Sequence, residues 1–166
     1  MKAKEMAQKP RIRVDAGIRR LTQELNREDS RLRPRILDAA LAGLRLERNP
    51  ESLELRRDAA QVWAAIQQIL SHHLDAEEKR LLPWLEQQER LSPEVMRKVL
   101  ECHDKLRKLM GSIVEAGAEH LTEAKARDAG RALSGLAVHL DDMIDDEERR
   151  LFPTIQKALF EAGRRG

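Results

Sequence analysis

The sequence predicts an all-α fold, an up-down-up-down four-helix bundle, on the basis of its composition and of four amphipathic runs. Tyr is absent and only two Phe and two Trp occur, whereas β-strands favour aromatic and β-branched residues. Leu, Ala, Glu, Arg and Lys dominate the chain, and these residues favour helices. The breaks between the runs are short, so consecutive helices are expected to pack antiparallel.

Proline residues divide the first half of the chain into two expected helices. The first helix is expected from about residue 14 to about residue 48, with a kink at Pro34, which lies inside it. Asn49 and Pro50 then break the chain. The second helix follows this break, and Pro83 is expected to bend it or to end its main run.

Capping residues mark the third and fourth helices. Ser92 is the expected N-cap of the third helix, with Pro93 in the first helical position. This helix is expected to stop near Gly117, and His120 is expected to lie in the connection that follows. Thr122 is the expected N-cap of the fourth helix.

One domain accounts for nearly all of the 166 residues, with residues 1–12 as a flexible N-terminal arm and residues 13–162 as the bundle. The net charge of +2 comes from interspersed charges of both signs, so we expect no nucleic-acid partner. No stretch approaches the roughly 20 apolar residues of a membrane span, and no signal-peptide core is present, so we expect a cytoplasmic protein without a membrane partner. Cys102 is the single cysteine, which excludes an internal disulfide.

Two segments of the chain repeat one another. Residues 73–83 read HLDAEEKRLLP and residues 143–153 read MIDDEERRLFP. Aligned on their prolines, the segments share six identical pairs: Asp75/Asp145, Glu77/Glu147, Glu78/Glu148, Arg80/Arg150, Leu81/Leu151 and Pro83/Pro153. The second and fourth helices are therefore predicted to be equivalent parts of a pseudo-twofold bundle, each bent at its proline.

The second helix carries a histidine and a carboxylate on its expected core face. His73 and Glu77 are four residues apart and share the face of the apolar positions Val62, Ile66, Ile69, Leu70 and Leu81. An unpaired buried carboxylate costs several kcal/mol, and a metal ion offsets that cost when it takes histidine nitrogen and carboxylate oxygen as ligands. His72 is expected to face away from His73 and to be solvated.

The other helices each add one candidate ligand to an apolar stripe. His103 lies among Met96, Val99, Leu106 and Met110 in the third helix, and Glu147 follows Leu136, Leu140 and Met143 in the fourth. Asp29 lies among Leu25, Leu32 and Ile36 in the first helix. Such convergence is how helical bundles build dinuclear metal sites.

Other interpretations of these residues stay open at this point. A single histidine on an apolar stripe is more often a hydrogen-bonded core residue than a ligand. Asp29, or the pair Glu77 and Glu147, could lie at the solvent edge and pair with arginines. His139 shares the face of Glu147 farther up the fourth helix, either as a displaced ligand or as an ordinary histidine at the edge of the core. Cys102 is expected to be a buried thiol rather than a ligand.

These residues resemble the hemerythrin-like HHE cation-binding family. HLDAEEKRLLP matches its second-helix signature, a His followed four residues later by Glu and then by an apolar pair and Pro. Glu101-Cys102-His103 followed by Leu106 is similar to the third-helix signature. The resemblance extends from about residue 14 to residue 160, and it implies a hemerythrin-like bundle that holds two irons between histidines and bridging carboxylates.

Carried over to this chain, the resemblance implies His73 and His103 as terminal ligands and Glu77 and Glu147 as bridging ligands. Two positions depart from the family pattern. Asp29 stands where the first helix normally has His and is the expected substitute ligand. Met143 stands at the fourth-helix His position and is a poor ligand for iron. His139 is the candidate that could replace this missing imidazole.

The members of this family carry or sense oxygen, handle nitric oxide or iron, or act in redox stress. The resemblance therefore implies a di-iron domain that senses or handles oxygen, nitric oxide or iron, with dioxygen or nitric oxide as its small ligand. The shortage of imidazoles leaves two alternatives, a haem-binding module that uses His73, His103 or His139, or a metal-free interaction module that binds a protein partner or a second copy. The sequence indicates no catalytic residue and leaves open whether the domain turns over a substrate.

Overall fold

The computed structural model describes residues 3–114 and 121–164, with side chains from residue 16 onward. These residues form four helical rods, and no strand occurs among them. The first rod is α1 (Ala3–Arg48) and the third is α4 (Pro93–Val114). The second rod consists of α2 (Leu53–Ala76), the π-helical turn η1 (Glu77–Leu81) and α3 (Leu82–Gln87). The fourth consists of α5 (Glu123–Asp146), the π-helical turn η3 (Glu147–Leu151) and α6 (Phe152–Arg164).

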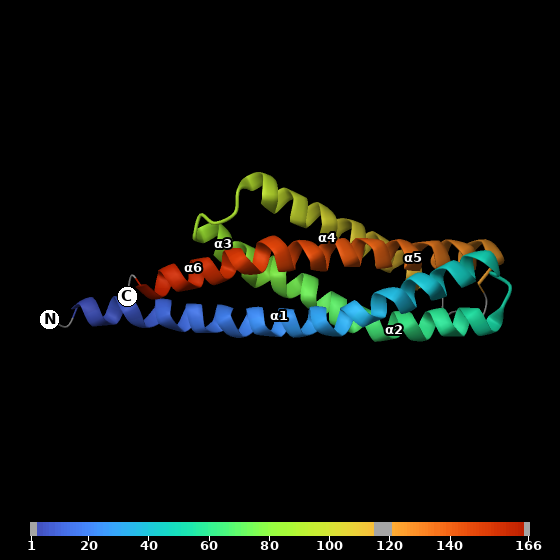
Figure 1. Cartoon of the computed structure of the whole chain (residues 1–166), viewed down its shortest axis with the longest axis horizontal. Helices are drawn as coiled ribbons and strands as arrows, with labels where there is room; N and C mark the ends of the chain where they lie inside the picture. The colour runs from blue at the N-terminus through green and yellow to red at the C-terminus, as the bar shows by residue number, and fades with distance from the viewer. Residues whose placement is uncertain (1–2, 115–120, 165–166) are drawn as a thin grey trace.

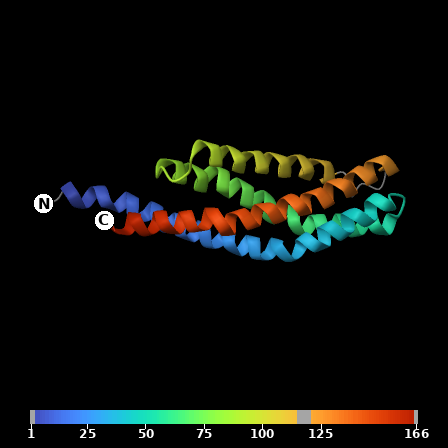
Figure 2. The ribbon, with the colours of Figure 1, turned by 45° about the horizontal axis from the view of Figure 1, so that its top comes forward.

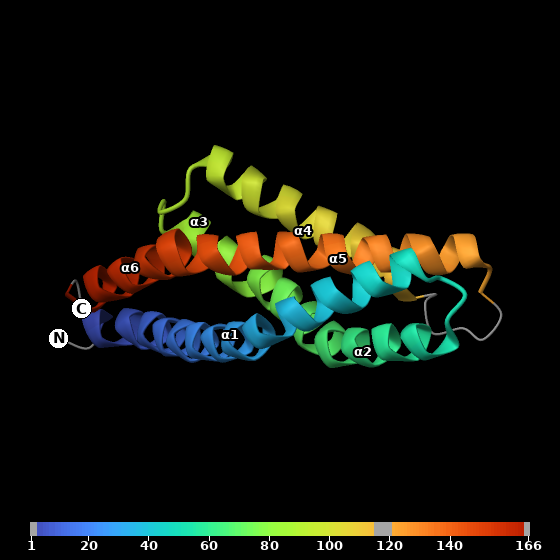
Figure 3. The ribbon, with the colours of Figure 1, turned by 45° about the vertical axis from the view of Figure 1, so that its right-hand side comes forward.

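The rods alternate in direction, which confirms the predicted up-down-up-down bundle. α1 leads away from the end that carries both termini, α2 and α3 return, α4 leads away again, and α5 and α6 return (Figure 1). α1 packs against α2 and most extensively against α5, while α4 packs against α5. Figure 2 shows α4 beside the rod of α2 and α3, and Figure 3 shows α1 approaching α5 toward the end opposite the termini.

Helix α1 is longer than the sequence analysis predicted. It begins at Ala3, so the helix includes residues 3–12 of the predicted N-terminal arm. This segment is rich in Ala, Lys, Glu, Met and Gln, which favour helices. The flexibility of this segment stays a prediction. α1 runs through Pro34 without interruption, and its ribbon changes direction between its blue and cyan parts (Figure 1).

The predicted caps of the later helices are confirmed. The Ser92 hydroxyl accepts a hydrogen bond from the Val95 N–H at 3.3 Å, and Pro93 is the first residue of α4. The Thr122 hydroxyl accepts one from the Lys125 N–H, also at 3.3 Å, and α5 begins directly afterwards. The expected end of the third helix near Gly117 and the expected loop position of His120 lie outside the described residues.

The sequence repeat takes the form of two π-helical turns. In η1 the Leu82 N–H donates to the Glu77 carbonyl, and in η3 the Phe152 N–H donates to the Glu147 carbonyl. Pro83 and Pro153 follow directly, and a proline ring would crowd the carbonyl four residues before it in a regular α-helix. The wider π turn relieves this crowding, so neither proline ends its rod. Such turns are frequent at functional sites.

Two apolar cores fill the bundle, one on each side of a polar layer. The core toward the α1–α2 connection includes Leu32, Ile66, Leu70, Leu106, Leu140 and Ile144. The core toward the termini includes Leu21, Leu25, Leu81, Leu85, Leu151 and Ile155. The first rod passes from one core to the other between Leu25 and Leu32, and the second rod does so between Leu70 and Leu81. The inner positions between these leucines hold ionisable residues.

α1 and α5 approach one another closely at two glycines. A Cβ atom added at Gly130 would lie 2.6 Å from the Glu47 backbone N and 2.7 Å from the Gly43 carbonyl oxygen. A Cβ atom added at Gly43 would lie 2.5 Å from the Ser134 backbone N. Because these neighbours are backbone atoms, neither helix can make room by rotating a side chain.

Gly130→Ala is expected to lower the free energy of unfolding by about 2 kcal/mol, because overpacking of a close contact typically costs about 1–3 kcal/mol. Urea denaturation followed by circular dichroism measures the loss. Gly111→Ala is the control, since no atom lies within 4 Å of the added Cβ there. This variant is expected to gain about 0.5–1 kcal/mol from helix propensity. A Gly130→Ala protein as stable as Gly111→Ala would contradict the close packing of α1 on α5.

Candidate metal centre

The five inner-face residues predicted as ligands meet in one buried cluster between the two apolar cores. They come from all four rods, and none is more than 4% exposed: Asp29, His73, Glu77, His103 and Glu147. The structure adds Glu28, which is 8% exposed and was not among the predicted ligands. Burial of this many ionisable groups in one place is costly unless the groups neutralise one another or bind cations.

His73 lies at the centre of the carboxylates. Its Nδ1 atom is 3.4 Å from Glu28 Oε2 and 3.5 Å from Asp29 Oδ1, both contributed by α1. Its Nε2 atom is 3.2 Å from Glu147 Oε2 and 3.9 Å from Glu77 Oε1. One ligand atom from each of Asp29, His73 and Glu147 lies within 4.8 Å of the others, close enough for the three to share one cation.

Glu77 lies between the two imidazoles of the cluster. Its Oε2 atom is 3.2 Å from His103 Nε2, and its Oε1 atom is 3.9 Å from His73 Nε2. Each oxygen of this carboxylate therefore has a different histidine as its neighbour. Because Glu77 is the first residue of η1, the π-helical turn lies at the level of the cluster.

The side-chain oxygen and nitrogen atoms of the cluster lack hydrogen-bond partners, although buried polar atoms normally have them. Ten buried side-chain atoms are in this state within the described part of the chain: Glu28 Oε2, both oxygens of Asp29, both nitrogens of His73, both oxygens of Glu77, His103 Nε2 and both oxygens of Glu147. These are histidine nitrogens and carboxylate oxygens, the donors that suit Fe, Mn or Zn ions. The residues present therefore fit a metal centre.

Glu78 and Arg107 orient His103, and sequence reasoning missed both. The Nδ1–H of His103 donates to Glu78 Oε1 at 2.9 Å, and the other oxygen of Glu78 accepts from Arg107 at 3.1 Å. Arg107 also donates to Asp75 at 3.0 Å. A proton held on Nδ1 leaves the Nε2 lone pair directed at the cluster, the usual arrangement behind a metal-binding histidine. The acidic pair Glu77-Glu78 was the available signal.

The same outer arrangement recurs on the opposite side of the bundle. Arg33 on α1 lies 3.2 Å from Asp145 and 3.0 Å from Glu148, the repeat partners of the two carboxylates that bind Arg107. Arg33 follows Asp29 by four residues, as Arg107 follows His103. α1 and α4 are therefore equivalent as well, which extends the predicted pseudo-twofold to the whole bundle. In this symmetry Asp29 corresponds to His103.

The alternative that placed the inner carboxylates at the solvent edge is wrong. Asp29, Glu77 and Glu147 are buried, and their ion-pair partners among the described residues are histidines rather than arginines. Arginines pair instead with the outer carboxylates, as Arg33 and Arg107 do. The repeated Glu-Glu pair thus places its first member in the cluster and its second outside it.

Met143 and His139 occupy different environments on α5. Met143 is 5% exposed and lines a cavity of about 250 Å³ together with Cys102, His103 and Glu147. His139 is half-buried, and no hydrogen bond or ion pair joins it to the cluster in the described structure. It precedes Glu147 by eight residues, which is roughly 12 Å along a helix. Cys102 is half-buried, and burial raises the pKa of its thiol.

His72 has a partner that the sequence analysis did not predict. Its side chain is 50% exposed, as expected for a solvated residue. Its Nδ1 atom, however, lies 2.7 Å from Glu28 Oε1. His72 and the buried His73 therefore contact the two oxygens of one carboxylate.

Burial and mutual proximity shift the protonation of the cluster. Burial raises the pKa of Asp29 to about 6 and raises the pKa of Glu147 well above its ordinary value. Burial opposes the charged form of His73, but Glu147 and Glu28 outweigh it and raise the pKa of His73 well above 6.5. Burial likewise opposes the charged form of Glu28, but His73 and His72 hold the pKa of Glu28 below 4.5. Without a metal the cluster therefore retains protons.

A four-helix bundle with buried histidines and carboxylates from all four rods defines the class of bundle proteins that bind metal ions in their core. The family model of the hemerythrin HHE cation binding domain matches residues 17–155. The chain therefore belongs to the hemerythrin HHE cation-binding domain family. No curated protein and no solved structure matches the chain. Across residues 3–114 and 121–164, no helix is long and apolar enough to span a membrane.

The contribution of Asp29 to the stability of the metal-free protein is expected to fall as the pH rises from 3.8 to about 6, because Asp29 binds its proton more tightly in the folded chain over that window. The raised pKa of Glu147 acts in the same direction to higher pH. The stabilisation by protonated His73 is complete below 6.5, decreases as the pH rises above 6.5, and is lost once the pH has passed the raised pKa of His73. Urea denaturation of chelator-treated protein at several pH values measures this slope. Asp29→Asn should flatten it, and equal slopes in the two proteins would contradict the shift at Asp29.

Proposed function

We propose that this domain holds two iron ions and senses or handles dioxygen, nitric oxide or iron. The observation that carries the proposal is Glu77, whose two oxygens lie beside different imidazoles, at 3.9 Å from His73 Nε2 and 3.2 Å from His103 Nε2. A carboxylate in this position suits a bridge between two ions better than a ligand of a single ion. In this arrangement His73 and His103 are terminal ligands, and Glu77 and Glu147 are bridging ligands.

The charge of the cluster supports two ions. Glu28, Asp29, Glu77 and Glu147 are all buried, and each carries a negative charge when ionised. Two divalent ions would balance four such charges while both imidazoles stay neutral, as metal ligation requires. Asp29 then serves as the substitute ligand on the side of His73, because its Oδ1 atom lies 3.5 Å from that ring.

The two halves of the proposed centre differ in their protein ligands. Met143 holds the position equivalent to His73 and is a poor ligand for iron. The cavity beside it also reaches His103 and Glu147, so a small molecule has room next to this half. Bound iron would supply the redox and gas-binding chemistry that side chains lack. The chain's own residues fix the histidines, exclude bulk water and leave one side accessible.

The positions of the carboxylates favour non-haem iron over the haem alternative. Glu77 and Glu147 both lie within 4 Å of His73 Nε2, and Glu77 also lies beside His103 Nε2. A haem held between these two histidines would have to displace both carboxylates into an apolar core. An absorption spectrum separates the alternatives, because haem gives an intense Soret band and oxo-bridged di-iron gives weaker near-ultraviolet bands.

His73→Ala and Glu77→Ala are each expected to remove most of the bound iron, because each takes donor atoms from the centre of the cluster. The near-ultraviolet bands should weaken in proportion, together with any spectral change when dioxygen or nitric oxide is added to the reduced protein. Elemental analysis and absorption spectra of protein purified without added metal provide the measurement.

Glu54→Gln is the matched control for these variants, since Glu54 is an exposed carboxylate near the start of α2. It should retain full iron content and the same spectra. Unchanged iron in both His73→Ala and Glu77→Ala would overturn the proposed site. A colourless wild-type protein without metal would favour the interaction module, with a protein partner or a second copy as its ligand.

Met143→His is expected to raise iron occupancy or affinity. The repeat aligns Met143 with His73, and Met143 lines the cavity beside His103 and Glu147. An imidazole at this position therefore has space and lies next to the proposed ligands. Competition with a chelator, followed through the near-ultraviolet absorption, gives the change in affinity.

His139→Ala provides the comparison, because His139 lies outside the cluster and its loss should leave iron binding unchanged. If His139→Ala releases iron while Met143→His has no effect, His139 is the imidazole of the fourth rod and the assignment to Met143 is wrong. If neither substitution changes binding, the fourth rod supplies no imidazole and the di-iron proposal gives way to its alternatives.

A further inference from the structure

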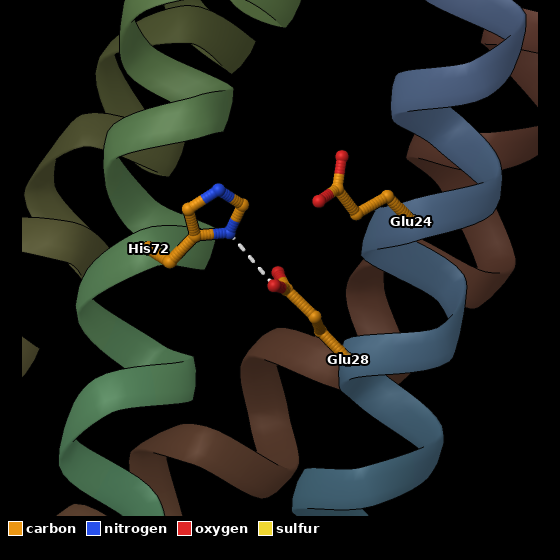
Figure 4. A group of neighbouring side chains, drawn as sticks. All are labelled: Glu24, Glu28 and His72. Atoms are coloured by element: carbon orange, nitrogen blue, oxygen red, sulfur yellow. Dashed lines mark hydrogen bonds and ion pairs between the residues drawn. The ribbon is translucent and has the colours of Figure 1, made fainter.

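A second group of ligand-type side chains lies outside the buried cluster, at the contact between α1 and α2. Glu24 and Glu28 are one helical turn apart on α1, and His72 faces them from α2 (Figure 4). One ligand atom from each residue lies within 4.8 Å of the others. Glu24 and His72 are exposed, so solvent reaches this group directly.

The contacts within the group leave Glu24 without a partner. His72 Nδ1 lies 2.7 Å from Glu28 Oε1, and Figure 4 marks this interaction. The carboxylate of Glu24 points toward the same ring, yet it has no hydrogen bond or ion pair among the described residues. Two carboxylates one turn apart repel each other unless a cation lies between them. A simple His72–Glu28 ion pair therefore accounts for two of the three residues and leaves Glu24 unexplained.

Glu28 connects this exposed group to the buried cluster. It is 8% exposed, and its Oε2 atom is buried without a hydrogen-bond partner. That atom lies 3.4 Å from His73 Nδ1 in the buried cluster, while Oε1 lies beside His72. One nearly buried carboxylate thus belongs to both groups, with one oxygen in each.

We propose that Glu24, Glu28 and His72 form a second metal site, open to solvent, for a divalent first-row cation such as Mn²⁺, Fe²⁺ or Zn²⁺. One imidazole nitrogen and carboxylate oxygens from two residues suit these ions, and water completes the coordination. The cation replaces the proton held between His72 Nδ1 and Glu28 Oε1, because a ligating nitrogen must be free of its proton.

The shared carboxylate couples this surface site to the buried cluster. A cation bound by Glu28 Oε1 uses the carboxylate whose other oxygen faces His73, so a change of Glu28 itself affects both sites. This coupling rests on the proposed function of the core, whereas the surface site itself does not.

Titration with Mn²⁺, with free ion followed by electron paramagnetic resonance, tests the proposal on the full chain. Wild-type protein is expected to bind Mn²⁺ at a class of site additional to the core. Glu24→Gln should weaken this additional class ~10-fold or more, because it removes one of three ligands, and should leave core occupancy intact. Glu28→Gln should weaken both classes. Glu54→Gln, the exposed carboxylate control, should match wild type.

A further variant separates failure of the surface site from failure of the core. His103→Ala should lose core binding and retain the additional class, since His103 lies on α4, away from the three residues. If Glu24→Gln binds Mn²⁺ as wild type does, the proposed surface site is wrong and the His72–Glu28 contact is an ion pair only. If His103→Ala keeps all of its metal while Glu24→Gln loses one class, the surface site stands and the proposed core function fails.

Discussion

A layer of carboxylates and imidazoles enclosed between two apolar cores is the constraint on which the rest of this bundle depends. Each isolated buried charge costs several kcal/mol. Ten buried side-chain oxygen and nitrogen atoms of this layer, among the described residues, have no hydrogen-bond partner. Such a layer is compatible with a stable fold only if cations or retained protons neutralise it. All four rods contribute residues to this layer. The packing of the helices therefore depends on how the charges of the layer are neutralised.

The outer ion pairs of the bundle follow the pseudo-twofold symmetry, whereas the inner residues of the cluster do not. Arg33 and Arg107 bind equivalent pairs of outer carboxylates, so both sides hold the rods in the same way. The inner positions differ, because Asp29 corresponds to His103 and Met143 corresponds to His73. The outer ion pairs are the same on both sides because they fix how neighbouring rods align along their length. The inner positions can vary because cation-binding sites tolerate different sets of ligands, so the two halves of the cluster differ chemically.

Sequence periodicity predicted the fold and the five inner residues because both depend on local spacing. His73 and Glu77 are four residues apart, and apolar neighbours one turn away identify the face they share. The sequence did not predict the roles of Glu28, Glu78 and Arg107, because these depend on which residue lies opposite on another rod. The π-helical turns were missed for a related reason. A proline in a helix predicts a distortion, but not whether the rod bends, ends or widens.

The buried cluster is reached from two sides by two kinds of surface. On the α4–α5 side, a cavity beside His103 has room for a small molecule. Its lining combines Met143 and other apolar residues with charged ones such as Asp142, Asp146 and Arg150. On the α1–α2 side, Glu28 links the exposed Glu24 and His72 to His73, which suits a cation that must exchange water for oxygen and nitrogen ligands. In the proposed functions, the small ligand therefore uses the cavity beside Met143, whereas the cation uses the carboxylate of Glu28.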